Sequence, residues 1–237
     1  MKRKIIIKVN WQEFYEFDKL YKKQQQFPPL PNPYTDKIQP ISHTGYLMFV
    51  RNKFLFRGIK ASFKNKNLYA SYALLKSYWE NSIAFGYYII NISQHLKSGN
   101  KEYAFKLSRK MALGGRGFVT ERMARNKGKT LKDFTLPSIA TMMNAIDNVL
   151  KTKLKITDSI SKELYRSMVA EGGHTTYIGL FICGRMLPNG SGLADIKKSW
   201  SKWEESQILN LVVMASKIFQ IFWNRFENIR KNYQVTP

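Results

Sequence analysis

The sequence predicts a mainly α-helical protein, a helical bundle with an N-terminal extended or β-hairpin appendage. Beyond about residue 68, apolar residues recur at spacings of one to four, which is typical of helices rather than strands. Glycine, asparagine and proline divide these segments into helix-sized lengths. An apolar share of 44% is enough for a globular core. We therefore expect an N-terminal arm over residues 1–66 and a bundle domain over residues 67–237.

The N-terminal arm has the composition of extended structure. Five of the eight prolines fall between Phe27 and Pro40, which indicates a polyproline-like linker. Two apolar runs follow, at 46–50 and 54–56, with Arg51, Asn52 and Lys53 between them. This pattern predicts two short strands in a hairpin within residues 45–65. The alternative is an apolar segment that packs against the helices.

The helical part divides into five predicted helices. The first begins near Leu68, runs for about 28 residues and ends before Ser98-Gly99-Asn100. Pro137 suits the first turn of the third helix, and Thr157 or Asp158 is an N-cap for the fourth. A loop is expected at 187–192. The remaining helices are expected at 101–113, 137–153, 158–186 and 193–232.

Net charge is the strongest global signal. The chain has 39 Lys and Arg against 16 Asp and Glu, a formal charge of +23. Such self-repulsion opposes a compact state unless an anionic partner or salt screens it. Nucleic acid is the commonest such partner, because phosphate neutralisation releases counterions. An anionic membrane surface and a merely basic surface are the alternatives.

The charge is concentrated between Lys101 and Lys132. Ten basic and two acidic residues give +8 in 32 residues. Glycines at 114, 115 and 117 allow the backbone to approach phosphates closely, and Phe118 is suited to stacking on a base. The alternative is a solvated, flexible loop. The candidate nucleic-acid-binding residues are Lys106, Arg109, Lys110, Arg116, Phe118, Arg122, Arg125, Lys127 and Lys129.

A second basic area lies in the N-terminal third, where cations alternate with aromatic residues. Arg51, Lys53, Arg57 and Lys60 are interleaved with phenylalanines. In another such stretch, four cations (Lys2, Arg3, Lys4 and Lys8) are mixed with four aromatic residues (Trp11, Phe14, Tyr15 and Phe17). This pattern favours single-stranded or irregular RNA. The alternative is that these aromatic residues belong to a core.

Several function classes lack the residues they need. Cys183 is alone, which excludes an intramolecular disulfide and favours a reducing, cytoplasmic compartment. His43, His95 and His174 are far apart in sequence, so we expect no metal or other cofactor. The N-terminus lacks the apolar run of a secretory signal. The apolar stretch 208–226 contains Lys217 and Arg225, which favours a buried helix over a membrane span.

Two segments resemble a known family. LLKSYWENSIAFGYYI (74–89) and KELYRSMVAEGGHTTYIGLFI (162–182) are similar to the helices of HEPN-like domains in bacterial defence and toxin systems. The resemblance implies that Lys76, Glu80, Tyr165 and His174 lie near one another. It also implies a metal-independent endoribonuclease in which His174 acts as acid or base, Arg166 stabilises charge and Glu80 orients.

The spacing of the basic pair departs from the family pattern. HEPN ribonucleases place four to six residues between the arginine and the histidine, whereas seven separate Arg166 from His174. We therefore expect a noncatalytic nucleic-acid-binding subunit of a ribonucleoprotein or of a defence or mobile-element complex, with RNA favoured over DNA and other protein subunits as further partners. The alternatives are the endoribonuclease and a scaffold that binds a protein through residues 208–226.

Overall fold

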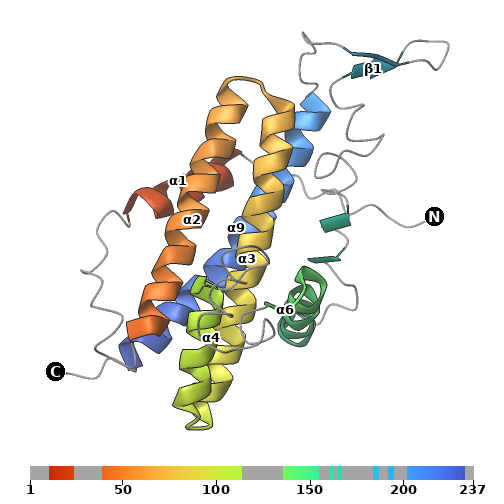
Figure 1. Ribbon diagram of the computed structural model, residues 1–237. Coiled ribbons are helices and arrows are strands. Elements are labelled where there is room, and N and C mark those ends of the chain that lie inside the picture. Colours follow the sequence, from red (N-terminus) through yellow and green to blue (C-terminus); the bar gives the residue numbers. More distant parts are fainter. Residues whose placement is uncertain are drawn as a thin grey trace. The chain divides into compact units, whose positions relative to one another are not determined.

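The computed structural model of the chain describes residues 11–23, 39–113, 136–154, 161–162, 165–166, 184–186, 192–194 and 202–232. Helices dominate these residues, which confirms the mainly α class (Figure 1). The helices are α1 (Trp11–Lys23), α2 (Gln39–Lys64), α3 (Leu68–Lys97), α4 (Lys101–Leu113), α6 (Ile139–Leu154) and α9 (Lys202–Asn232). The strands are β1 (Gly184–Met186) and β2 (Gly192–Ala194).

The predicted hairpin within residues 45–65 is wrong, because α2 covers this stretch. Buried residues of α2 recur every three or four positions, at Tyr46, Phe49, Asn52, Phe56 and Ile59. That is a helical period. The sequence hides it because the buried stripe includes a polar residue, Asn52, while the apolar Leu47 and Phe54 face solvent. Aromatic and β-branched residues also favour strands in propensity arguments.

The end of the helix predicted at 158–186 and the start of the helix predicted at 193–232 need correction. Residues 184–186 form β1 instead of the last turn of a helix, and residues 192–194 form β2 instead of the first turn of the next. The strands pair antiparallel, with Arg185 opposite Leu193. Pro188, Asn189 and Gly190 lie between them in sequence, and turn-forming residues between two short segments favour a hairpin. The predicted helices at 68–97, 101–113 and 137–153 are confirmed by α3, α4 and α6. However, α6 begins at Ile139, so Pro137 precedes the helix instead of lying in its first turn, and Ser138 caps it.

The described residues belong to two compact units that do not follow chain order. The first contains residues 1–25, 52–82 and 158–218, and the second contains 26–51, 83–157 and 219–237. Helices α2, α3 and α9 each contribute residues to both units. Residue 66, where we expected the arm to end, lies in the turn between α2 and α3.

In the first unit, α1 packs against α2 and a polar network crosses the core. Phe14 stacks on Phe56 with ring centroids 4.8 Å apart. The Tyr78 hydroxyl lies 2.8 Å from that of Tyr21 and 2.7 Å from Ser216 Oγ of α9. Burial raises the pKa of Tyr78 well above its ordinary value, so the phenol stays protonated. Because buried polar groups need partners, this network specifies how α1, α3 and α9 align.

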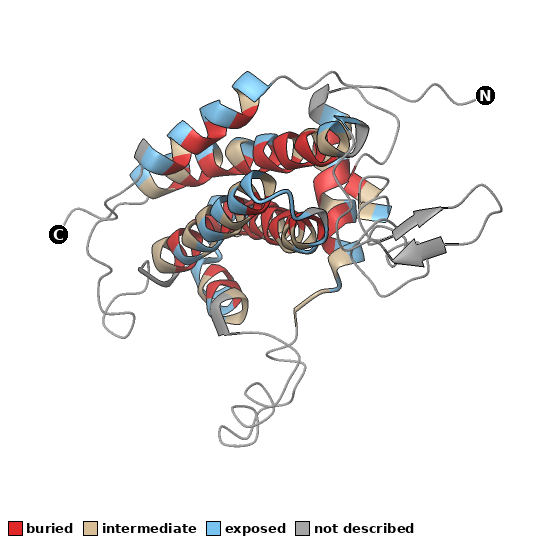
Figure 2. Cartoon of the chain, turned by 90° about the horizontal axis from the view of Figure 1, so that it is seen from above, coloured by how far each residue is buried: buried red, intermediate tan, exposed pale blue. Residues whose placement is uncertain are grey.

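In the second unit, aromatic rings from α2, α3 and α9 form the core. Phe49 lies against Trp223 with centroids 4.3 Å apart, and Phe85 lies 4.7 Å from Phe219. Gly86 allows close packing, since a Cβ there would lie 2.7 Å from a ring carbon of Phe222. Within each unit, buried residues lie on the faces that the helices turn toward one another (Figure 2).

One described segment, Glu205–Asn232, is long and apolar enough to cross a membrane by length and composition alone. Within its apolar window, 61% is buried inside the chain. Its buried residues include Val212, Phe219 and Phe222. The core helix of a soluble protein meets the same criteria, and this burial fits such a helix.

Candidate nucleic-acid interface and the Glu80 cluster

The described part of the chain offers a strongly cationic helix, α2. It carries Arg51, Lys53, Arg57, Lys60 and Lys64 and contains no aspartate or glutamate. Like charges three or four residues apart on a helix repel each other. The pairs Lys53–Arg57 and Lys60–Lys64 are both four residues apart. The charge pattern therefore opposes the helix that carries it unless an anion offsets the repulsion.

Four of these cations form the α2 cationic row, defined as Lys53, Arg57, Lys60 and Lys64. At 100° per residue they fall within an arc of about 60° around the helix axis. Arg57 and Lys64 are exposed, and Lys53 and Lys60 are half-buried. Arg51 lies about 160° around the helix from Lys53, so it does not belong to the row. The row is a line of cations along one side of the helix.

Electrostatics within the row are uneven. Partial burial lowers the pKa of Lys53, and the positive charge of Arg57 lowers it further. The positive charge of Lys60 is neutralised by Asp18 of α1, because Lys60 Nζ lies 2.5 Å from Asp18 Oδ2. An anion bound beside Lys53 and Arg57 would relieve their mutual repulsion, and guanidinium and ammonium groups are suited to phosphate.

The turn after α2 is built like the turn after α3. In both, the backbone N–H of an asparagine three residues past the helix bonds five residues back: Asn67 to Ser62 at 2.9 Å, and Asn100 to His95 at 2.8 Å. The asparagine side chain then caps the next helix. The aligned sequences are Lys64-Asn65-Lys66-Asn67 and Lys97-Ser98-Gly99-Asn100.

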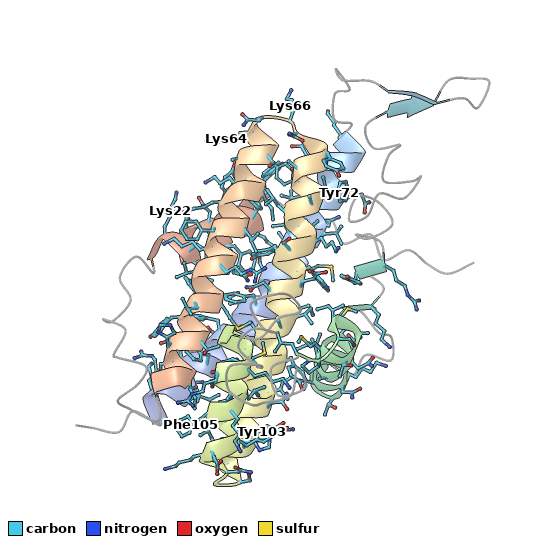
Figure 3. The ribbon with its side chains drawn as sticks, viewed as in Figure 1. Lys22, Lys64, Lys66, Tyr72, Tyr103 and Phe105 are labelled. Carbon is cyan, nitrogen blue, oxygen red and sulfur yellow. The ribbon has the colours of Figure 1, made fainter. Side chains whose placement is uncertain are left out.

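The two turns differ at the position with positive φ. Gly99 has a φ of 75°, where glycine is favoured, but the first turn places Lys66 there with a φ of 51°. A non-glycine residue in this region costs about 1–2 kcal/mol. Lys64 and Lys66 both lie at this end of α2 (Figure 3). The chain thus has a cation where glycine would be more stable. Sequence reasoning missed this, although the similarity of the two tetrapeptides could have revealed it.

The predicted basic segment lies partly in α4. Lys106 and Arg109 are exposed there and Lys110 is half-buried. Lys106 Nζ lies 3.0 Å from Glu102 Oε1, with both side chains solvent-exposed. Such exposed pairs contribute little stability. Arg116, Phe118, Arg122, Arg125, Lys127 and Lys129 lie outside the described residues.

The N-terminal aromatic residues divide between core and surface. Phe14, Phe17 and Phe56 are buried, in agreement with the core alternative. Phe54 is 64% exposed and neighbours Lys53. Trp11 and Tyr15, at the start of α1, are also exposed. Cations and exposed rings therefore share the surface of the first unit.

The Glu80 cluster brings together three of the four residues that the HEPN-like resemblance implies. Tyr165 Oη donates to Glu80 Oε1 at 3.0 Å, and Lys76 Nζ lies 4.0 Å from the same oxygen. Burial, together with the hydrogen bond to Glu80 and the charge of its carboxylate, raises the pKa of Tyr165 to about 12. Tyr165 is therefore a protonated donor at neutral pH. Arg166 is exposed beside it in sequence, and His174 lies outside the described residues.

Comparison with known proteins adds nothing to this geometry: no family model, no curated protein and no solved structure matches the chain. Among the residues that the structure describes, no three His, Cys, Asp or Glu side chains are grouped so that they could hold a metal ion. The described residues therefore provide two kinds of candidate site. One is a surface of cations and exposed aromatic rings, and the other is the cluster of Glu80, Tyr165 and Lys76.

Proposed function

We propose that the chain is a noncatalytic nucleic-acid-binding protein that holds phosphates along the α2 cationic row, with RNA favoured over DNA. The observation that carries the proposal is a 26-residue helix with five cations and no acid. The presence of Lys66 at a position of positive φ supports it, because it adds a further cation at the end of the row. A cytoplasmic ribonucleoprotein or a defence or mobile-element complex suits such a subunit.

Charge reversal in the row tests the proposal. We expect Arg57→Glu with Lys64→Glu to lower affinity for a generic RNA at least tenfold, measured by fluorescence anisotropy. The slope of log affinity against log salt should fall by about 0.7–0.9 for each phosphate that the variant no longer neutralises. Both side chains are exposed, so the fold should survive, and circular dichroism checks that it does.

The matched control changes the net charge equally at another place. Lys202→Glu with Lys231→Glu reverses two exposed cations of α9 and should cost less than threefold in affinity. Equal reductions in the two double variants would mean that diffuse charge, not the row, binds the polyanion. An unaltered protein that binds neither RNA nor DNA at low salt would overturn the proposed function. Parallel measurements with DNA of the same sequence test the preference for RNA.

The Glu80 cluster favours a second candidate, a metal-independent endoribonuclease of the HEPN-like kind. In it, His174 is the acid or base, Arg166 stabilises developing negative charge, and Glu80 orients its neighbours. Incubation with RNA in excess chelator tests this candidate. Cleavage that disappears in both His174→Ala and Glu80→Gln supports it, whereas intact RNA, or cleavage that survives His174→Ala, removes it.

The scaffold alternative rested on the apolar stretch 208–226. In the structure most of its large apolar side chains are buried, including Ile208, Phe219 and Trp223. Ile221 is 40% exposed. The apolar character that suggested a partner-binding helix is thus largely used within the chain.

A further inference from the structure

We propose that Trp11 and Tyr15 form a platform on which unpaired bases stack, so that the polyanion is single-stranded. This inference rests on the proposed function and deepens it, since it names the class of nucleic acid. We define the Trp11 platform as Trp11, Tyr15 and Phe63. Its site is at the start of α1, beside the end of α2.

The two exposed rings lie next to each other on one side of α1. Trp11 and Tyr15 are four residues apart, about 40° around the helix. They are 37% and 50% exposed, respectively. Their ring centroids are 6.0 Å apart and their planes differ by 31°. Two neighbouring rings with similar inclination are thus both partly open to solvent.

The rings of the Trp11 platform pack against the core of the first unit. Trp11 contacts Phe63 of α2 with centroids 5.7 Å apart and Phe14 at 5.6 Å. Tyr15 lies 5.9 Å from Phe14. Phe14 is 1% exposed and stacks on Phe56. The rings are therefore positioned before any ligand arrives, which reduces the entropy cost of binding.

The charges around the platform suit a phosphate backbone. Lys19 is exposed on α1, four residues after Tyr15 and about 40° from it around the helix, whereas Lys22 lies about two turns beyond Tyr15 and pairs with Asp18. Lys64 follows Phe63 directly and is exposed. Two of the nearby acids are neutralised: Glu13 Oε2 lies 3.0 Å from Lys217, and Asp18 binds Lys60 and Lys22. Glu16 is exposed about 140° from Trp11.

Aromatic faces surrounded by cations favour single strands over duplexes. Every base has a π face that can stack on an exposed ring, but a duplex keeps these faces inside its own stack. An apolar protein partner would also contact the rings, yet it would not need the surrounding lysines. The combination thus indicates single-stranded RNA or DNA, with the α2 cationic row continuing the phosphate contacts.

The test compares a single strand with a duplex that carries the same number of phosphates. Tyr15→Ser should lower affinity for the single strand about tenfold, the reduction expected for one stacked base, and should leave duplex affinity unchanged. Tyr69→Ser, which removes a ring that is 48% exposed on α3, is the matched control and should change neither. Tyr15→Phe should restore binding, because the ring suffices.

Trp11 provides a second measurement that leaves an aromatic ring packed against the core. Single-stranded RNA should quench the emission of the unaltered protein more than that of Trp11→Phe, which keeps a ring in place. Binding of single strands that is unaffected by Tyr15→Ser, or lowered equally for duplexes, would overturn the platform while leaving the proposed function intact. A surviving single-strand affinity with an unquenched Trp11 would also overturn it. Absence of any nucleic-acid binding would overturn both.

Discussion

Lys66 opposes stability through its backbone conformation, and under the proposed function it adds a cation for binding. We expect Lys66→Gly to raise the free energy of unfolding by about 1 kcal/mol, because glycine tolerates the φ of 51° that strains lysine. The same change removes a cation and should lower RNA affinity. Urea unfolding and anisotropy measure the two effects. Lys66→Ala removes the charge and keeps the backbone strain, so it should lower RNA affinity without raising the free energy of unfolding. Destabilisation by glycine would contradict the argument.

Asp18 illustrates a charge whose role depends on pH. Burial alone would raise its pKa, but hydrogen bonds and charges from Lys60 and Lys22 outweigh burial and hold the pKa below the ordinary value of 3.8. A depressed pKa means that Asp18 stabilises the fold above pH 3.8 and that this contribution disappears as the pH falls through the lower, folded-state value.

We therefore expect Asp18→Asn to lower the free energy of unfolding by about 1–2 kcal/mol at pH 7, because the variant cannot form the charged hydrogen bonds. The difference between the variant and the unaltered protein should shrink as the pH is brought below 3.8. Urea unfolding across this range measures it. A difference that stays constant with pH would show that packing, and not the ion pair with Lys60, accounts for the destabilisation.

Helix packing depends on glycines whose neighbours differ in how far they can move. At Gly86, an added Cβ would lie 2.7 Å from the Phe222 ring, which is fixed in the core. We expect Gly86→Ala to destabilise by about 1–3 kcal/mol, more than the helix propensity that alanine gains. At Gly58 the nearest atom is a Leu74 methyl at 3.1 Å. Gly58→Ala should therefore be near neutral in urea unfolding, and equal destabilisation at both positions would refute the distinction.

At the level of elements, the sequence predicted α3, α4, α6 and most of α9, but not α1 or α2. In the helices that were predicted, most buried positions are apolar, although α3 also buries Asn81 and Ser82. In α2 composition and burial disagreed, because Asn52 is buried with its Nδ2 donating to Ser82 Oγ, while Phe54 is exposed. A buried polar residue whose partner lies on another helix cannot be recognised from local sequence.

The sequence predicted the kind of site, which stays a prediction, but not the position of its cations. Composition indicated a polyanion partner, and Arg51, Lys53, Arg57 and Lys60 were chosen as secondary contacts. Only the helical geometry of α2 separates Arg51 from the other three and adds Lys64. The position of Lys66 depends on its backbone conformation, and the exposure of Trp11 depends on packing against Phe63. Both arise from tertiary structure, which residue type alone does not encode.

The charge of the whole molecule leads to a last prediction. At +23, self-repulsion should lower stability at low salt and be relieved as salt screens it. Raising NaCl from about 0.01 to 0.1 M shortens the screening length from about 30 to 10 Å. The melting temperature should therefore rise, by about 2–4 °C for each 1 kcal/mol of repulsion removed.

The α2 cationic row should account for part of this dependence. In Arg57→Gln with Lys64→Gln, two exposed cations are neutralised and the rise with salt should be smaller, while the melting temperature at low salt should be higher. Neutralising Lys202 and Lys231 in the same way removes equal net charge from α9 and should reduce the salt dependence less, since these two residues lie at opposite ends of a helix rather than in a row. A melting temperature that is flat or falls with salt would mean that the cations are already balanced within the folded chain. The reason for assigning the row to an external polyanion would then disappear.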